Sequence, residues 1–205
     1  MSLWRWLTGK RRAWDPDHLA KGDPWMRLPL APPLPAFGPG AGHDFPHYLE
    51  GTSRVRAATP AEVAEWLLGC RYADDAMLLD EHDYWQHPCT FEVVRSGDCE
   101  DYALWAWRKL VEARYDADFV VGVHRRPDGV EGRHAWVVYR DGSAEYVLDG
   151  VRRSVEAIIR LRSVTAEEYV PQVGVTRAGV RFVYAGLYRT TWGRQVTLQP
   201  HKGEA

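Results

Sequence analysis

The residue types in this chain that could carry nucleophilic chemistry are a cysteine, a histidine and an aspartate, at Cys99, His134 and Asp149. Cys99 follows Gly97-Asp98 at the start of a predicted helix, and a helix N-terminus favours a thiolate over a thiol. His134 could take the thiol proton and later protonate a leaving amine. Asp149 could orient the imidazole and stabilise its charged form. In this order the three residue types predict a Cys-His-Asp triad for acyl transfer.

The elements that must position this triad are one helix and a hairpin. Residues 99–115 are predicted to form a helix, with Cys99 at the open end of its buried face. Strands are predicted at three segments rich in β-formers, residues 118–124, 133–140 and 144–148. The last two pair across a turn at residues 141–143, so the hairpin brings Asp149 close to His134.

Other segments complete the predicted fold. Thr59-Pro60-Ala61-Glu62 has the hydroxyl, proline and glutamate of a helix N-terminus, and Gly69 ends that helix. Residues 154–161 predict a short helix, with a strand as the alternative, and residues 180–188 predict a late strand. Helices come first and a mostly antiparallel sheet follows, so the order favours an α+β fold.

Three blocks of this sequence carry a family resemblance. They are GDCEDYA at residues 97–103, RHAWV at residues 133–137, and Leu148-Asp149. Together they resemble the bacterial transglutaminase-like cysteine proteinases, which belong to the transglutaminase-like, papain-related superfamily, and the resemblance covers roughly residues 59–165. It implies a papain-like core, in which a helix packs on an antiparallel sheet. It also implies Cys99 as nucleophile, His134 as base and Asp149 as the orienting residue.

The acids beside the nucleophile suggest a cation. Asp98, Glu100 and Asp101 suit the first turn of a helix, because carboxylates there oppose its dipole. Two carboxylates next to a thiol should also raise its pKa, so a positive charge is expected to offset them. His134 as imidazolium is one candidate, and Ca²⁺, which prefers oxygen ligands, is the other. In some periplasmic adhesin-cleaving members of the resembled family the acids on either side of the cysteine bind calcium, which would make Asp98 and Glu100 the ligands here.

Acyl transfer also needs hydrogen-bond donors for the oxyanion. The backbone N–H of Cys99 is the natural first donor, and either Gln86 or the indole of Trp85 is the candidate for the second. The spacing does not decide between them. His82, His87 and Cys89 lack the further ligand that a zinc site needs, so we interpret them as unrelated to metal binding. Cys70 and Cys89 are interpreted as structural.

We therefore predict a thiol-dependent amide hydrolase, a cysteine peptidase that forms an acyl-enzyme on a protein or peptide substrate. One alternative is transglutaminase-type acyl transfer or crosslinking on the same triad. The other is a transglutaminase-like module that binds without turnover. A cofactor is not required by this chemistry, apart from the Ca²⁺ considered above.

Composition limits the remaining possibilities. The 205 residues carry a formal net charge of −2, which argues against a nucleic-acid partner. No apolar run is long enough to span a membrane, and the N-terminus does not resemble a signal peptide, so a cytoplasmic location is expected. Residues 2–12 combine tryptophans with basic residues, which could contact an anionic membrane. We favour an apolar tip that packs on the body or on a partner.

Three regions are predicted. Residues 1–58 form a Pro-rich arm that holds eight of the 13 prolines; it could be a linker, wrap the domain, or strap the cleft. Residues 59–196 form the transglutaminase-like catalytic domain, and residues 197–205 are a polar tail.

Overall fold

The structure is a computed structural model that describes residues 15–74 and 83–189. Its largest element is a seven-stranded sheet in the order β1-β9-β8-β4-β5-β6-β7, with every neighbouring pair antiparallel. Its strands are β1 (Arg27–Leu28), β4 (Asp116–Arg125), β5 (Glu131–Asp141), β6 (Ala144–Leu148), β7 (Ile159–Leu161), β8 (Tyr169–Thr176) and β9 (Arg181–Tyr184). A short parallel pair, β2 (Arg71–Tyr72) and β3 (Ser96–Gly97), lies apart from it.

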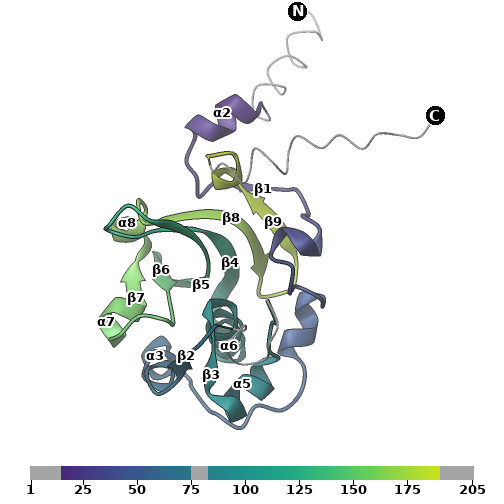
Figure 1. Cartoon of the computed structure of the whole chain (residues 1–205), viewed down its shortest axis with the longest axis vertical. Helices are drawn as coiled ribbons and strands as arrows, with labels where there is room; N and C mark the ends of the chain where they lie inside the picture. Colours follow the sequence, from purple (N-terminus) through teal and green to yellow (C-terminus); the bar gives the residue numbers. More distant parts are fainter. Residues whose placement is uncertain (1–14, 75–82, 190–205) are drawn as a thin grey trace, which may run out of the picture.

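The helix at Cys99–Glu112 and its neighbours at Pro60–Leu68 and Pro88–Val94 lie on one face of the sheet (Figure 1). The described helices are α2 (Pro16–Lys21), α3 (Pro60–Leu68), α5 (Pro88–Val94), α6 (Cys99–Glu112), α7 (Val155–Ile158) and α8 (Arg162–Thr165), with 3-10 turns at Leu34–Ala36, Phe45–Leu49 and Ala185–Arg189. The α+β class predicted from the order of elements is confirmed. No helix among residues 15–74 and 83–189 is both long and apolar enough to cross a bilayer.

The strands divide their side chains between two clusters, as a period of two requires. Phe119, Val121 and Val137 face α6 and join the main core. Their neighbours Val120 and Trp136 face the opposite side, in a smaller cluster with Trp25, Val138, Val147, Tyr169, Phe182 and Tyr184. The sheet is therefore apolar on both faces in its central strands.

Helix α6 is the central helix of the molecule. A single apolar face was predicted for it, yet every residue from Glu100 to Leu110 is buried. The reason is that α3, α5 and the Phe45–Leu49 turn pack on its remaining sides. Even Arg108 and Lys109 are buried, so their charges must be satisfied inside the fold.

The described part of the arm packs against the body. Strand β1 pairs with β9, and Phe37, Phe45 and Tyr48 lie in the main core, where Phe45 contacts Phe119. In Figure 1 this segment runs in purple and blue past β9 toward α5. Residues 2–12 and the tail from residue 197 lie outside the described residues, so the predictions made for them stay predictions.

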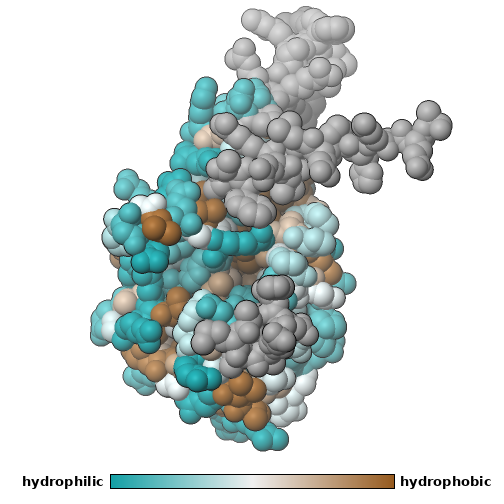
Figure 2. All heavy atoms as spheres, viewed as in Figure 1, coloured by the Kyte–Doolittle hydropathy of each residue, from teal (hydrophilic) through white to brown (hydrophobic). Residues whose placement is uncertain are grey.

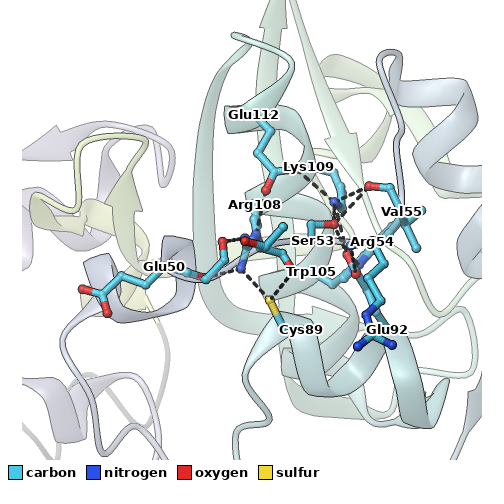
Figure 3. Close-up of polar contacts among 12 residues, drawn as sticks. Glu50, Ser53, Arg54, Val55, Cys89, Glu92, Trp105, Arg108, Lys109 and Glu112 are labelled. Carbon is cyan, nitrogen blue, oxygen red and sulfur yellow. Dashed lines mark hydrogen bonds and ion pairs between the residues drawn. The ribbon is translucent and has the colours of Figure 1, made fainter.

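Buried charges on α6 hold the end of the arm (Figure 3). Arg108 donates from Nη1 to the carbonyl of Glu50 at 2.6 Å and from Nη2 to that of Gly51 at 2.7 Å. Lys109 donates to the carbonyl of Val55 at 2.7 Å and pairs with Glu92 at 3.1 Å. Residues 50–55 are therefore fixed to the C-terminal half of α6.

The surface in the view of Figure 2 is mixed, with apolar residues in small groups among polar ones. Exposed apolar side chains such as Val93, Val130, Val164 and Val180 come from different elements. Such scattered exposure is ordinary for a protein surface.

Candidate active site

Cys99 is the first residue of α6, and its place there follows from the turn before it. Asp98 is the N-cap residue with an extended backbone, although its carboxylate makes no capping hydrogen bond. Gly97 permits the close approach of the helix, because a Cβ at this position would lie 2.1 Å from Oδ2 of Asp101. The glycine of the GDCEDYA block is thus required by packing.

The environment of Cys99 favours the neutral thiol. Burial raises the pKa of the Cys99 thiol well above its ordinary value, and the carboxyls of Glu100 and Asp98 raise it further. The backbone N–H of Ala135 donates to the sulfur and opposes this shift only in part. The thiol therefore needs a base at the moment of attack, rather than resting as a thiolate.

His134 and Asp149 form the second part of the site. His134 lies on β5, and Asp149 follows β6 directly, so the antiparallel pairing of Val137 with Leu148 carries Asp149 toward the start of β5. Nε2 of His134 lies 3.0 Å from Oδ1 of Asp149. An ionised carboxylate only accepts, so Nε2 carries the proton and Nδ1 of the neutral ring has the lone pair.

Asp149 is held as an anion although it is buried. Burial alone would raise its pKa, but the imidazole of His134, the hydroxyl of Tyr169 and the guanidinium of Arg152 outweigh burial and hold the pKa well below the usual range. Only 1% of the residue is exposed. A buried carboxylate with this pKa can stabilise a protonated imidazole throughout the neutral range.

A cavity of about 230 Å³ brings the nucleophile and the histidine together. It lies between the start of α6, the start of β5 and the arm. Its lining residues are Phe37, Gly38, Pro39, Asp83, Trp85, Cys99, Glu100, Val121, Arg133, His134 and Ala135. Asp149 does not border it and lies behind His134, so only two members of the predicted triad face the cavity.

The arm supplies one wall of this cavity. The guanidinium of Arg133 donates to the carbonyl of Ala36 at 2.7 Å. The backbone N–H of Gly40 donates to Oδ2 of Asp83 at 2.8 Å, and a Cβ on Gly40 would lie 2.3 Å from the Asp83 carbonyl oxygen. The wall formed by residues 36–40 is therefore attached at two points to residues that line the cavity.

Both predicted side-chain donors for an oxyanion donate to other groups of the protein in this structure. Gln86 does not line the cavity, and its amide N–H groups donate to the carbonyl of Ser96, at 2.9 Å, and to Asp101. Trp85 does border the cavity, but its indole N–H donates to Oδ1 of Asp83 at 2.9 Å. The backbone N–H of Cys99 is the donor that remains from the prediction.

The acids on either side of Cys99 form a pair of carboxyls that could hold calcium. Burial raises the pKa of Glu100, and a hydrogen bond with the carboxyl of Asp98 raises it further, so the two carboxyls lie together. Oε1 of Glu100 is buried with no hydrogen-bond partner in the structure. A close carboxyl pair with an unsatisfied oxygen suits a Ca²⁺ ion, which prefers such ligands. Across residues 15–74 and 83–189, however, no three potential metal ligands cluster, and Asp101 binds Gln86 instead.

The other cysteines lie away from the cavity and have arginine partners that the sequence did not reveal. Nη1 of Arg108 lies 3.2 Å from Sγ of Cys89, and Arg95 forms a hydrogen bond with Cys70. His87 caps α5 by accepting from the Cys89 N–H at 3.2 Å. His82, part of the rejected metal cluster, lies outside the described residues.

Sequence reasoning missed several residues around the site. Arg133 and Asp83 border the cavity, and Tyr169 and Arg152 contact Asp149. Arg133 is adjacent to His134 and could have been noticed there. Tyr169 could not, because its strand was not predicted.

Comparison with known proteins gives a distant likeness. No family model matches the sequence, and no curated protein matches it. Solved structures with a similar fold include three of Legionella pneumophila LapG, one of them calcium-bound and one EGTA-treated. They are 18–20% identical with TM-scores of 0.44–0.45, and the match covers 56–63% of this chain and 60–69% of those chains. For the first two, this chain spans less than two thirds of their length. At this level of likeness, function has to be judged from the residues of the cavity.

Proposed function

We propose that this chain is a thiol-dependent amide hydrolase, a cysteine peptidase that acts on a protein or peptide. The observation that carries the proposal is the shared cavity of Cys99 and His134, with Asp149 bonded to the far nitrogen of the imidazole. The transglutaminase-like character of the enzyme rests on the three sequence blocks that contain these residues.

The proposed reaction follows from the protonation states. Nδ1 of His134 takes the proton of the Cys99 thiol as the sulfur attacks the substrate carbonyl, and Asp149 stabilises the imidazolium that forms. The imidazolium then protonates the amine, the C–N bond breaks, and a thioester remains on Cys99. His134 next takes a proton from water, which attacks the thioester and releases the acid and the thiol.

The backbone N–H of Cys99 is the proposed donor to the oxyanion. It lies at the N-terminus of a helix of 14 residues, where N–H groups are not used within the helix and the dipole favours negative charge. A second donor is not assigned, because the indole of Trp85 is bonded to Asp83.

The proposal includes a calcium ion for which the carboxylates of Asp98 and Glu100 would be ligands. When bound, the ion would supply a positive charge that offsets two carboxyls beside the thiol. The support is the contact between these carboxyls and the unsatisfied Oε1 of Glu100.

Two rivals use the same residues. In acyl transfer, a primary amine replaces water in the attack on the thioester. In a binding module, the cavity would hold a ligand and Cys99 would not react. Hydrolysis is preferred because the GDCEDYA block resembles the proteinase branch of the superfamily.

The test is alkylation of each cysteine by iodoacetamide between pH 6 and 10, followed by mass spectrometry, with Ca²⁺ or with EGTA. We expect Cys99 to be alkylated at neutral pH and this alkylation to be lost in His134→Ala. The alkylation of Cys70 and Cys89 should be the same in His134→Ala as in the wild type. A Cys99 whose alkylation is the same in His134→Ala would overturn the proposal and favour the binding module. Products formed from an amide substrate with and without a primary amine then separate hydrolysis from transfer.

A further inference from the structure

Asp149 uses its two carboxylate oxygens for different partners. Oδ1 lies 3.0 Å from Nε2 of His134 and accepts from the backbone N–H of Val151 at 3.4 Å. Oδ2 accepts from the hydroxyl of Tyr169 at 2.6 Å and from Nε of Arg152 at 3.0 Å. The partners of Oδ2 come from β8 and from the loop after β6, so two separate parts of the chain converge on one oxygen.

We propose that Tyr169 and Arg152 are positioning residues for Asp149. They hold Oδ2 in place, so that Oδ1 stays directed at the imidazole of His134. The inference rests on the proposed function, because it assigns roles behind the same triad. The terminal torsion of an aspartate is broad and roughly two-fold. Without the two partners of Oδ2, the carboxylate would depend on the bonds of Oδ1 to His134 and to the Val151 N–H, the second of which is long at 3.4 Å.

Tyr169 is suited to this role because its ring is buried and packed between two other rings. Its residue is fully buried, and its ring packs 5.0 Å from that of Trp136 and 4.9 Å from that of His124, measured between centroids. Its hydroxyl also accepts from Nη2 of Arg152 at 2.8 Å. A rigid ring therefore fixes the position of the hydroxyl that donates to Asp149.

Arg152 also acts on the second histidine of the site. Its Nη2 lies 2.7 Å from Nε2 of His124, and a guanidinium only donates, so this nitrogen of His124 is the acceptor. Burial, together with the nearby His134 and Arg152, lowers the pKa of His124 to about 4. His124 therefore stays neutral at neutral pH. Its ring centroid lies 5.4 Å from that of His134.

The outer part of this network keeps Arg152 in place. Arg160 donates to both oxygens of Glu168, at 2.8 and 3.0 Å, and from Nη2 to the hydroxyl of Tyr169 at 3.3 Å. Glu168 lies 3.6 Å from Nη2 of Arg152. The charged and titratable groups that we find around Asp149 are thus His134, His124, Arg152, Tyr169, Arg160 and Glu168.

The same sheet provides a matched control elsewhere. Asp118 is also buried, pairs with Arg140 and Arg27, and lies near the buried Tyr184. The side chain of Arg140 is 27% exposed, as is that of Arg152. Tyr184 and Tyr169 belong to the same apolar cluster. Neither Arg140 nor Tyr184 borders the cavity, so changes there measure structural loss alone.

The test compares Tyr169→Phe and Arg152→Gln with Tyr184→Phe and Arg140→Gln in the full chain. The first readout is the rate of Cys99 alkylation by iodoacetamide across pH. The second is the NMR resonance of the His134 Nε2 proton, assigned by its loss in His134→Ala. We expect Tyr169→Phe to slow neutral alkylation about tenfold, at the low end of the effect of outer-shell partners, and to shift or broaden the imidazole resonance. The two control variants should leave both readouts unchanged.

The outcomes separate the positioning role of Tyr169 and Arg152 from the proposed thiol-dependent function. If Tyr169→Phe and Arg152→Gln leave the pH profile and the resonance as in the wild type, the positioning role is overturned. If Cys99 alkylation does not depend on His134, the proposed function fails, and the imidazole resonance alone then decides the positioning role. Should Arg152→Gln not fold, Tyr169→Phe decides, since it keeps the buried ring. Arg152→Lys should restore the charge without restoring the wild-type profile, because one ammonium cannot reach Asp149, Tyr169 and His124 together as the guanidinium does.

Discussion

The sulfur of Cys99 lies 3.3 Å from Oε2 of Glu100, the next residue in the chain. A carboxyl beside the candidate nucleophile works against thiolate formation. In this site the acid and the histidine therefore have opposite effects on the same proton.

Replacing Glu100 should make Cys99 more acidic. Because Glu100 raises the pKa of the thiol, Glu100→Gln should lower that pKa and increase the thiolate fraction at every pH below it. Each pKa unit of lowering increases the thiolate, and the alkylation rate, about tenfold. The measurement is the pH dependence of Cys99 alkylation in EGTA, with the exposed Glu65→Gln on α3 as control. A profile identical to that of the wild type would show that Glu100 does not act on the thiol.

The three cysteines should differ in function. Cys99→Ala should abolish turnover of an amide substrate and leave the melting temperature close to that of the wild type, because the half-buried thiol contributes little to the core. Cys70→Ala should leave activity nearly unchanged, since Cys70 does not border the cavity. Activity that survives in Cys99→Ala would rule out the covalent mechanism.

The stability of the fold should fall in mild acid because of His124. Its pKa is lowered to about 4 in the folded chain, against about 6.5 in an unfolded chain, so its contribution is complete above pH 6.5 and is lost as the pH falls toward 4. Asp118 has the opposite effect on the pH dependence of stability. Burial raises its pKa to about 6, so the group adds stability as the pH falls below that value. We expect urea unfolding of His124→Gln to lose less stability between pH 7 and 5 than the wild type. The control His18→Gln, at an exposed residue, should lose as much stability over this pH range as the wild type. If His124→Gln also loses as much as the wild type, His124 is not the cause of the loss.

The arm should be needed for folding rather than act as a removable strap. The strap hypothesis predicts that deletion of residues 1–58 raises activity, but that deletion would remove Phe37, Phe45 and Tyr48 from the core. Phe45 is 1% exposed, so Phe45→Ala should cost about 3–5 kcal/mol in the free energy of unfolding. Leu30→Ala, at a residue 41% exposed, is the control and should be nearly neutral. A folded, more active deletion variant would restore the strap hypothesis.

Local signals predicted helix α3 and the hairpin that carries His134 and Asp149. The capping pattern at Thr59 gives α3, with the hydroxyl accepting from the Glu62 N–H at 3.2 Å. Alternating β-formers and a tight turn give the β5–β6 hairpin. These signals act within a few residues, so a single sequence is enough to find them.

Strand β8 was missed for a physical reason. It contains Pro171, and a proline removes a ladder hydrogen bond, which argues against a central strand. The neighbouring strand β4 accommodates it by a register shift between Val121 and Gly122, where Gly122 faces Pro171. A Cβ on Gly122 would lie 2.3 Å from the carbonyl oxygen of Val170, so the glycine makes the room. This compensation involves residues about 50 positions apart and cannot be read locally.

Two other segments were predicted in part. Residues 154–161 give a short helix, α7, but Ile159–Leu161 then pair with β6 because that strand would otherwise be the edge of the sheet. The late strand ends at Tyr184, and a 3-10 turn follows. In the site, the partners of the Gln86 amide, Ser96 and Asp101, are set by tertiary contacts that a single sequence does not show.

The two attachments of the arm have a topological consequence. Residues 36–40 are bonded at the cavity, and residues 50–55 are bonded to Arg108 and Lys109 on α6 (Figure 3). The intervening stretch, with exposed residues at Gly42, His43 and Asp44, is thus a loop closed by noncovalent bonds at both ends. A proteolytic nick in that stretch should leave the two fragments associated and the cavity complete, so this wall of the cleft behaves as a fixed part of the body with no single hinge.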